Sequence, residues 1–174
     1  VVTQVRRFDH MVMDLLELSR IDAGSTELHR EEVDLRELLP RIAHRYGFGD
    51  VPIDIDSKVP GLVRLDKLRV ERTLANLLEN AREHGGGPVR LFAEPAPKRH
   101  LVLGVDDAGP GVARSERSRI FERFARGSAA RHRVGTGLGL ALVAEHAQAH
   151  GGEAWVEDRP GGGARFKVSL SEAW

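Results

Sequence analysis

Three short segments of this chain carry side chains and backbone suited to holding a phosphorylated ligand. They are NLLENAREH at 76–84, DDAGPGV at 106–112 and GTGLGLALV at 135–143. The first places two amides on one helical face, the second a carboxylate before a glycine turn, and the third bare backbone at the start of a helix. Occurring in this order within about one small domain, they predict an ATP pocket.

The amides of the first segment are suited to a magnesium site. Asn76 and Asn80 are four residues apart and share one helical face, which His84 continues one turn later. Amide oxygens are hard ligands for Mg²⁺, which keeps several waters and also takes phosphate oxygens. The alternative is that both asparagines are solvated surface residues. The other side of this helix carries residues expected to pack against a sheet: Leu74, Leu77, Leu78 and Ala81.

The second segment ends an apolar strand with a carboxylate. Asp107 follows LVLGV, and a carboxylate at a strand end can accept a hydrogen bond from an exocyclic amine such as that of adenine. Gly109 and Gly111 let the backbone turn tightly and approach a ring. Asp106 should face the opposite side of the strand. The alternative is an ordinary Asp-Gly hairpin turn.

The third segment predicts a helix N-terminus facing phosphates. Free N–H groups and the helix dipole favour anions there, at Gly135, Thr136, Gly137, Leu138 and Gly139. The glycine spacing departs from the dinucleotide-binding fingerprint, and no Lys-Ser/Thr follows as in a Walker loop. Three arginines just upstream could fold over a triphosphate, or could belong to a solvated basic loop: Arg126, Arg131 and Arg133.

Composition narrows the class of protein. The 174 residues suffice for one full domain plus a short appendage, and 41% hydrophobic residues can build a core. A formal net charge of zero gives no argument for a nucleic-acid partner. The absence of cysteine excludes disulfides and thiolate zinc sites. No apolar stretch approaches the ~20 residues that span a bilayer, so the fragment is not expected to be embedded in a membrane.

Hydrophobic patterning predicts an α/β protein. Residues 1–22 form an amphipathic helix whose apolar stripe requires partner helices; the alternative is a core helix of the domain that follows. Further helices are expected over 34–46, which Pro40 should kink or split, then 66–84, 115–124 and 137–150, with a loop over 125–134. Strands are expected near 33 and over 51–57, 88–94, 100–106, 153–158 and 164–170. The result is a two-layer α/β sandwich, with three helices on one face of a mixed sheet.

Together these segments resemble the catalytic ATP-binding domain of sensor histidine kinases, a family related to gyrase, Hsp90 and MutL. NLLENA matches its asparagine box, DDAGPGV its first glycine box, RIFERFARG (119–127) its phenylalanine box and GTGLGLALV its second glycine box. DLLELSRIDAG (14–24) is similar to the end of the second helix of the dimerisation domain. The resemblance implies a dimerisation-domain remnant over 1–24 and a catalytic domain with the Bergerat ATP-binding fold over 25–174.

The resemblance also implies roles for matched residues. Asn80 would coordinate Mg²⁺ with Asn76 beside it, and Asp107 would bind the adenine amine, partly through water. Gly109 and Gly111 would form the floor under the adenine. The loop between the phenylalanine box and the second glycine box would act as a lid, anchored by Phe121 and Phe124 and hinged at Gly135, Gly137 and Gly139, which would also contact the phosphates. Further ATP contacts would come from His84, Arg133, Thr136 and Leu138.

Residue 76 favours phosphotransfer over ATP hydrolysis. Hydrolysing relatives have a glutamate four residues before the metal-binding asparagine, whereas this chain has Asn76, and an amide cannot act as a general base. The resemblance implies a protein histidine kinase. In such a kinase the γ-phosphoryl of ATP passes to a histidine and then to an aspartate in the receiver domain of a response regulator.

The phosphoacceptor itself is missing, because none of the eight histidines has the family's setting for it. His10 lies on the second dimerisation helix and His84 near the pocket. The others are expected at the solvated surface: His29, His44, His100, His132, His146 and His150. The fragment should therefore bind ATP without labelling itself.

The chain begins at Val1 in the middle of a pattern, which indicates a fragment of a longer protein. The parent kinase would be membrane-anchored, with this portion in the cytoplasm, and would dimerise through a four-helix bundle. Since one helix of each pair remains, we expect this fragment to be a monomer or a weak associate. A tight dimer at low micromolar concentration in sedimentation would contradict that expectation.

Three positions depart from the family pattern. Glu83 stands where a lysine or arginine is common near the phosphates, Val134 where many members have a glycine, and Ala108 where asparagine is frequent. Arg82 beside Glu83 could compensate, although one helical step turns it by ~100°. Glu83 favours the alternative of a non-catalytic module that holds ATP or ADP as a regulatory ligand. An anti-sigma-factor serine kinase is a third candidate, against which the GTGLGL box and the first helix both argue.

Overall fold

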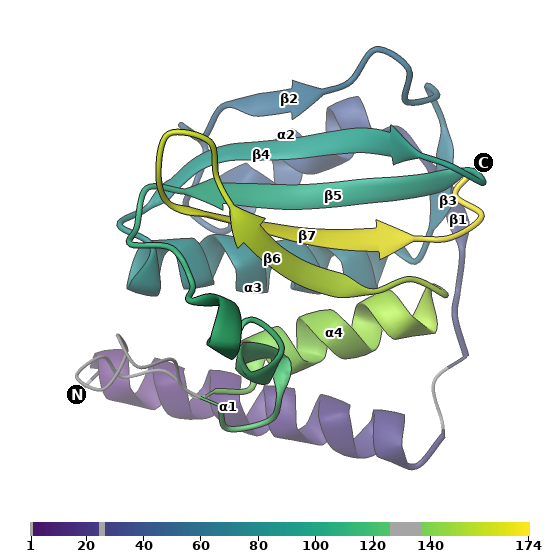
Figure 1. Cartoon of the computed structure of the whole chain (residues 1–174). Helices are drawn as coiled ribbons and strands as arrows, with labels where there is room; N and C mark the ends of the chain where they lie inside the picture. The colour runs from purple at the N-terminus through teal and green to yellow at the C-terminus, as the bar shows by residue number, and fades with distance from the viewer. Residues whose placement is uncertain (1, 25–26, 126–136) are drawn as a thin grey trace.

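The computed structural model describes residues 2–24, 27–125 and 137–174, without the side chains of residues 2–4, 6 and 7. Its main feature is a five-stranded sheet in the order β2-β4-β5-β7-β6 (Figure 1). Only the β2–β4 pair is parallel, so the sheet is mixed. The strands are β2 (Ile53–Ile55), β4 (Pro88–Ala96), β5 (His100–Asp107), β6 (Ala154–Asp158) and β7 (Ala164–Leu170).

Three helices cover one face of this sheet and share a single core with it. Leu101, Leu103 and Val105 alternate along β5 and point into that core, as the two-residue period of a strand requires. The predicted two-layer α/β sandwich is confirmed. The helices are α2 (Leu35–Arg45), α3 (Lys67–His84) and α4 (Gly139–Ala149).

Both ends of α3 lie where the sequence predicts them. Asp66 caps the helix by accepting a hydrogen bond from the Arg69 N–H at 3.1 Å. At the other end the Gly85 N–H donates to the Ala81 carbonyl. A fixed start and end set the rotation of α3, which decides which of its side chains face the sheet.

A second, two-stranded sheet pairs β1 (Glu31–Val33) with β3 (Val63–Leu65) in antiparallel fashion. The sequence predicts β1 but not β3. Three residues are too short a run to show a period, and the Arg64 N–H is bonded instead to the distant Ala173 carbonyl.

The predicted split at Pro40 does not occur, because α2 is one continuous helix with Pro40 inside it. Proline removes the N–H that would donate to the Arg36 carbonyl. Both residues lie on the exposed side of α2, where water can satisfy that carbonyl. The Asp34 side chain starts the helix by accepting from the Arg36 N–H at 2.8 Å.

The predicted helix over 115–124 is also wrong. The structure has two 3₁₀ turns there, η1 (Arg114–Glu116) and η2 (Arg119–Phe121). Ile120 and Phe121 pack against the core from the second of these turns. Phe124 then takes φ 61°, which excludes a helix at that position.

Helix α1 (Val2–Asp22) lies beside α4 with most of its apolar stripe uncovered (Figure 1). Among the side chains described on this helix, Leu18 alone is fully buried, against Leu138 and Leu142 at the start of α4. Asp22 forms a two-pronged ion pair with Arg123, at 2.6 and 2.8 Å. The exposed apolar residues of α1 are Val5, Phe8, Val12, Met13, Leu15 and Leu16. None of the described helices is both long and apolar enough to cross a membrane.

Two of the histidines expected at the surface are buried, which corrects that prediction. His146 is 2% exposed and His150 is 1% exposed. The Asp66 N–H donates to Nε2 of His150 at 3.1 Å, and Nδ1 of His150 lies 2.8 Å from the His146 carbonyl. This pair of contacts requires a neutral ring that carries its proton on Nδ1.

We expect His146 to make stability depend on pH. Burial, followed by the nearby Arg69 and Arg72, lowers its pKa to about 4, although Glu17 lies 3.1 Å from Nε2. The unfolded chain takes up this proton near pH 6.5 and the folded chain only near 4, so the unfolded state binds more protons between these values. The free energy of unfolding should therefore fall by up to about 3 kcal/mol as the pH drops from 7 to 4.

Chemical denaturation at several pH values checks this expectation. His146→Gln removes the titrating group and should flatten the pH dependence, whereas His44→Gln, at an exposed histidine, should leave it unchanged. Equal slopes in the wild type and in His146→Gln would show that His146 does not titrate with folding.

Candidate functional site

The site begins on the polar face of α3. Asn76, Asn80 and His84 are half-buried along this face. The opposite face is closed against the core, as predicted, by residues that are at most 1% exposed: Leu74, Leu77, Leu78 and Ala81. Because packing fixes the apolar face, the two amides and the imidazole stand in one row along the helix.

The N-terminus of α4 lies against this row. A Cβ at Gly139 would stand 3.3 Å from Oδ1 of Asn76, so only glycine leaves the amide its present position. Leu138, at the N-cap, has no side-chain acceptor for the N–H groups of the first turn. Those groups and the helix dipole remain suited to an anion beside the Asn76 amide.

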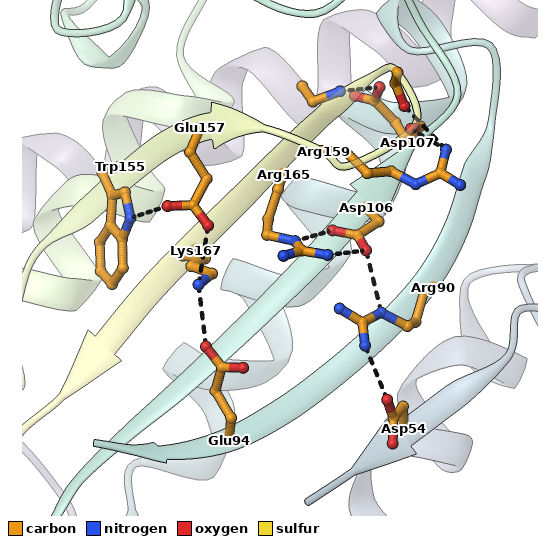
Figure 2. A network of polar contacts seen from close by, with 12 residues as sticks. Asp54, Arg90, Glu94, Asp106, Asp107, Trp155, Glu157, Arg159, Arg165 and Lys167 are labelled. Atoms are coloured by element: carbon orange, nitrogen blue, oxygen red, sulfur yellow. Dashed lines mark hydrogen bonds and ion pairs between the residues drawn. The ribbon is translucent and has the colours of Figure 1, made fainter. Parts of the chain in front are cut away.

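Two neighbouring aspartates leave the end of β5 on opposite sides of the sheet, as predicted (Figure 2). Asp106 points to the face without helices and pairs with Arg165, at 2.7 and 3.0 Å, and with Arg90, at 3.1 Å. These contacts hold the pKa of Asp106 below its usual value, although burial opposes them. The aromatic ring of Phe92 is buried beneath both arginines. Asp106 therefore has a structural role.

Asp107 points toward the α3 side and is 3% exposed. Its Oδ1 accepts hydrogen bonds from the backbone N–H groups of Gly109 and Ala164, both at 2.9 Å (Figure 2). Burial raises the pKa of Asp107, and these two bonds oppose the rise. The carboxylate is thus held in one orientation by backbone, which is what recognition of a ligand amine requires.

Three glycines make this arrangement possible through close contacts. A Cβ at Gly85 would lie 2.4 Å from Oδ2 of Asp107, and one at Gly109 would lie 2.6 Å from the Gly85 Cα. A Cβ at Gly163 would lie 2.0 Å from the Asp107 carbonyl oxygen. The sequence identifies Gly109 but not the roles of Gly85 and Gly163, which it indicates only as a helix stop and part of a hairpin turn. Gly111, at φ 78°, turns the chain next to Gly163.

The phenylalanine segment joins the second glycine segment through backbone. Phe121 packs on the core, with its ring edge toward Phe166 at a centroid distance of 6.4 Å. Phe124 is 64% exposed, but its N–H donates to the Gly137 carbonyl at 2.8 Å. Gly137, at φ 70°, leaves no room for a Cβ against Phe124. The remaining predicted residues lie outside the described part of the chain: Arg126, Arg131, Arg133, Gly135 and Thr136.

One polar atom near the Asp107 end of the row has no hydrogen-bond partner among the described residues. Nδ1 of His84 is buried and has no hydrogen-bond partner among the described residues, while its Nε2 lies 3.9 Å from a Glu83 oxygen. The described residues contain no group of three His, Asp or Glu side chains that could hold a metal ion. Any Mg²⁺ held by Asn80 would thus need water and phosphate oxygens as its other ligands, which is its usual mode of binding.

The residues that form this site lie within a region of the chain that matches a known protein family. The profile described as "Histidine kinase-, DNA gyrase B-, and HSP90-like ATPase" matches residues 65–173. The chain belongs to this ATPase family.

Relatives of the ATPase domain are sensor kinases. The signal transduction histidine-protein kinase AfsQ2 of Streptomyces coelicolor is 38% identical over 173 residues, covering 99% of this chain and 32% of AfsQ2. Full-length ShkA, solved in complex with AMPPNP, matches with a TM-score of 0.77 at 32% identity, over 94% of this chain and 35% of ShkA. The ATP binding domain of PrrB from Mycobacterium tuberculosis matches with a TM-score of 0.63 at 32% identity, over 82% of this chain and 97% of that domain.

The similarity to AfsQ2 includes α1 and the whole ATPase domain, which is therefore of the sensor histidine kinase type. The chain spans about a third of the length of such curated relatives.

Proposed function

We propose that this ATPase domain binds Mg–ATP between the polar face of α3 and the N-terminus of α4. Adenine would lie at the Asp107 end, where Gly85 and Gly109 bring two backbones together. The phosphates would lie at the Asn76 and Gly139 end, beside the first turn of α4. The single observation that carries the proposal is the buried Asp107 carboxylate, fixed by two backbone N–H groups.

The proposed reaction is transfer of the γ-phosphoryl to a histidine outside this chain, and from there to a response regulator in a membrane-anchored kinase. Mg²⁺ would neutralise charge on the phosphates when bound. Asn80 would hold the metal, and Asn76 would position the phosphates without acting as a base. The domain's contribution is positioning and charge stabilisation, and the sequence similarity to AfsQ2 supports this assignment.

Asp107→Asn tests the adenine assignment. The substitution removes a charged acceptor and turns one acceptor atom into a donor, so affinity for ATP should fall by about 10-fold or more. The preference for ATP over GTP should fall with it, measured by competition against a fluorescent ATP analogue. Asp54→Asn, at an exposed carboxylate of β2, is the matched control and should change neither value. An unchanged ATP preference in Asp107→Asn would reject the assignment.

A non-catalytic nucleotide-binding module is the second candidate, and Glu83 favours it. Its carboxylate lies near His84 on the row that would face the nucleotide, where a positive charge is common in the family. Supplying a first dimerisation helix with its histidine, together with Mg–ATP, separates the two functions. Labelling of that histidine supports the kinase, and tight Mg–ATP binding without any transfer supports the module.

A further inference from the structure

A cleft of about 920 Å³ lies at the opposite end of α3 from Asp107. Its walls come from α1, the segment 27–31, α2 and the first turns of α3. Helix α3 thus begins at this cleft and ends beside the proposed nucleotide site (Figure 1). The volume is within the range of pockets that bind small organic molecules.

Three exposed apolar side chains lie at the mouth of the cleft. Met13 and Leu16 of α1 are 52% and 50% exposed, and Leu68 in the first turn of α3 is 69% exposed. All three side chains line the cleft. Leu68 is the most exposed of the large apolar residues described. Because it lies at the mouth of the cleft, the aliphatic tail of a ligand can pack against it.

The floor of the cleft holds two polar side chains with unmet bonding capacity. Arg69 is 9% exposed: its Nε lies 3.4 Å from Asp66, and its Nη2 donates to the Glu27 carbonyl at 3.4 Å. Its Nη1 is buried and has no partner among the described residues. The same holds for Nδ1 of His146, which is 2% exposed and also lines the cleft. Nε2 of His146 lies 3.1 Å from a Glu17 carboxylate oxygen, so the proton of the neutral ring belongs on Nε2 and Nδ1 is an acceptor. Buried polar groups are nearly always paired, so the unpartnered N–H donor of Arg69 indicates a ligand with an acceptor.

The lining has six basic and five acidic side chains, and this excess of positive charge favours an anionic acceptor. Three of the acids already pair with cations: Glu17 with Arg72, Glu71 with Arg45, and Asp66 with Nε of Arg69. The two other acids in the lining, Glu27 and Glu31, are exposed at the rim. The remaining basic residues of the lining are Arg20, Arg41 and Lys67.

The cleft adjoins the main apolar stripe of α1. Met13 follows Phe8 by five residues, which places it ~140° around the helix at ~100° per residue. Leu16 also lines the cleft, and it follows Val12 by four residues, so it lies on the face of the stripe formed by Val5, Phe8 and Val12. The cleft and the helix-partner surface of α1 therefore share Leu16 and differ at Met13.

We propose that this cleft binds a small amphipathic carboxylate, with its carboxylate at Arg69 and its aliphatic tail between Met13, Leu16 and Leu68. The site is independent of the proposed nucleotide site. Its ligand would bridge α1 to the helix that carries Asn76 and Asn80.

Octanoate is the probe for a test on the whole chain. Calorimetry gives its affinity, and ¹H–¹⁵N spectra locate it; the amides of Met13, Leu68 and Arg69 should shift. Octanamide, which has the same tail without the charge, should bind at least 10-fold more weakly. A parallel titration with an ATP analogue keeps this result separate from the nucleotide proposal.

Two variants test the contacts of the octanoate carboxylate and of its aliphatic tail separately. Arg69→Gln should weaken octanoate binding at least 10-fold by removing the charged donor. Leu68→Ser should weaken it about 5-fold without risk to folding, because the side chain is exposed. Leu62→Ser is the matched control, since Leu62 is 55% exposed and outside the cleft.

Binding that Leu68→Ser weakens and Leu62→Ser does not, with octanamide inferior to octanoate, supports the proposal. Equal binding of octanoate and octanamide, equal effects of the two serine variants, shifts confined to other residues, or no binding at millimolar octanoate would each overturn it.

Discussion

Replacing Gly163 with alanine is expected to destabilise this domain by about 3 kcal/mol or more and to abolish nucleotide binding. The new Cβ would stand 2.0 Å from the Asp107 carbonyl oxygen, and the residue has φ 98°, where side chains are strained. The strand end that carries Asp107 has to move away from β7, which breaks the bond from the Ala164 N–H to the Asp107 carboxylate. Chemical denaturation and titration with an ATP analogue measure the two effects.

Gly162→Ala separates the effect of the steric clash with Asp107 from the effect of backbone strain at positive φ. Gly162 is in the same turn at φ 106°, but nothing lies within 4 Å of the position that its Cβ would take. Its cost should be about 1 kcal/mol, with nucleotide binding retained. If the two variants lose equal stability and equal affinity, the close contact between Gly163 and Asp107 does not position the site.

Asn80→Asp is the second large effect that we expect. The proposed metal ligand changes from a neutral amide to a carboxylate, which places an additional negative charge beside a triphosphate. Repulsion of the phosphates should weaken binding of an ATP analogue in the presence of Mg²⁺ by about 10–100-fold. Folding should be little affected, because Asn80 is only half-buried and stands on the polar face of α3.

The Asn80 experiment needs a control for the change of charge itself. Gln148→Glu converts an exposed amide of α4 to a carboxylate away from this face, and should leave affinity within about 2-fold of the wild type. Asn80 has no role at the metal if its aspartate variant keeps the wild-type affinity and the wild-type response to Mg²⁺.

Much of the site follows from periodicity alone. The four-residue spacing of Asn76 and Asn80 places both on one face, and the two-residue period of β5 sends Asp106 and Asp107 to opposite sides; the structure confirms both. Each prediction depends on local geometry within a single element. Packing then fixes the rotation of α3, because its apolar side is buried in the core that it shares with the sheet, α2 and α4.

Long-range contacts explain what the sequence does not predict. The need for glycine at 85 and 163 arises from Asp107, which is far away in sequence. His146 and His150 look like surface residues by type, but α4 buries them against α1, β3 and α3. The segment 114–121 has helix-forming residues, yet it forms two 3₁₀ turns, from which Ile120 and Phe121 pack against the core.

The central claim is that the row on α3, with Asp107 at one end and the start of α4 at the other, binds Mg–ATP. Calorimetric titration of a non-hydrolysable ATP analogue, with and without Mg²⁺, tests it most directly. We predict saturable binding at one site that strengthens when Mg²⁺ is present and weakens in Asp107→Asn. Absence of binding under both conditions, or binding that is indifferent to Mg²⁺ and to Asp107, would contradict this account of the site.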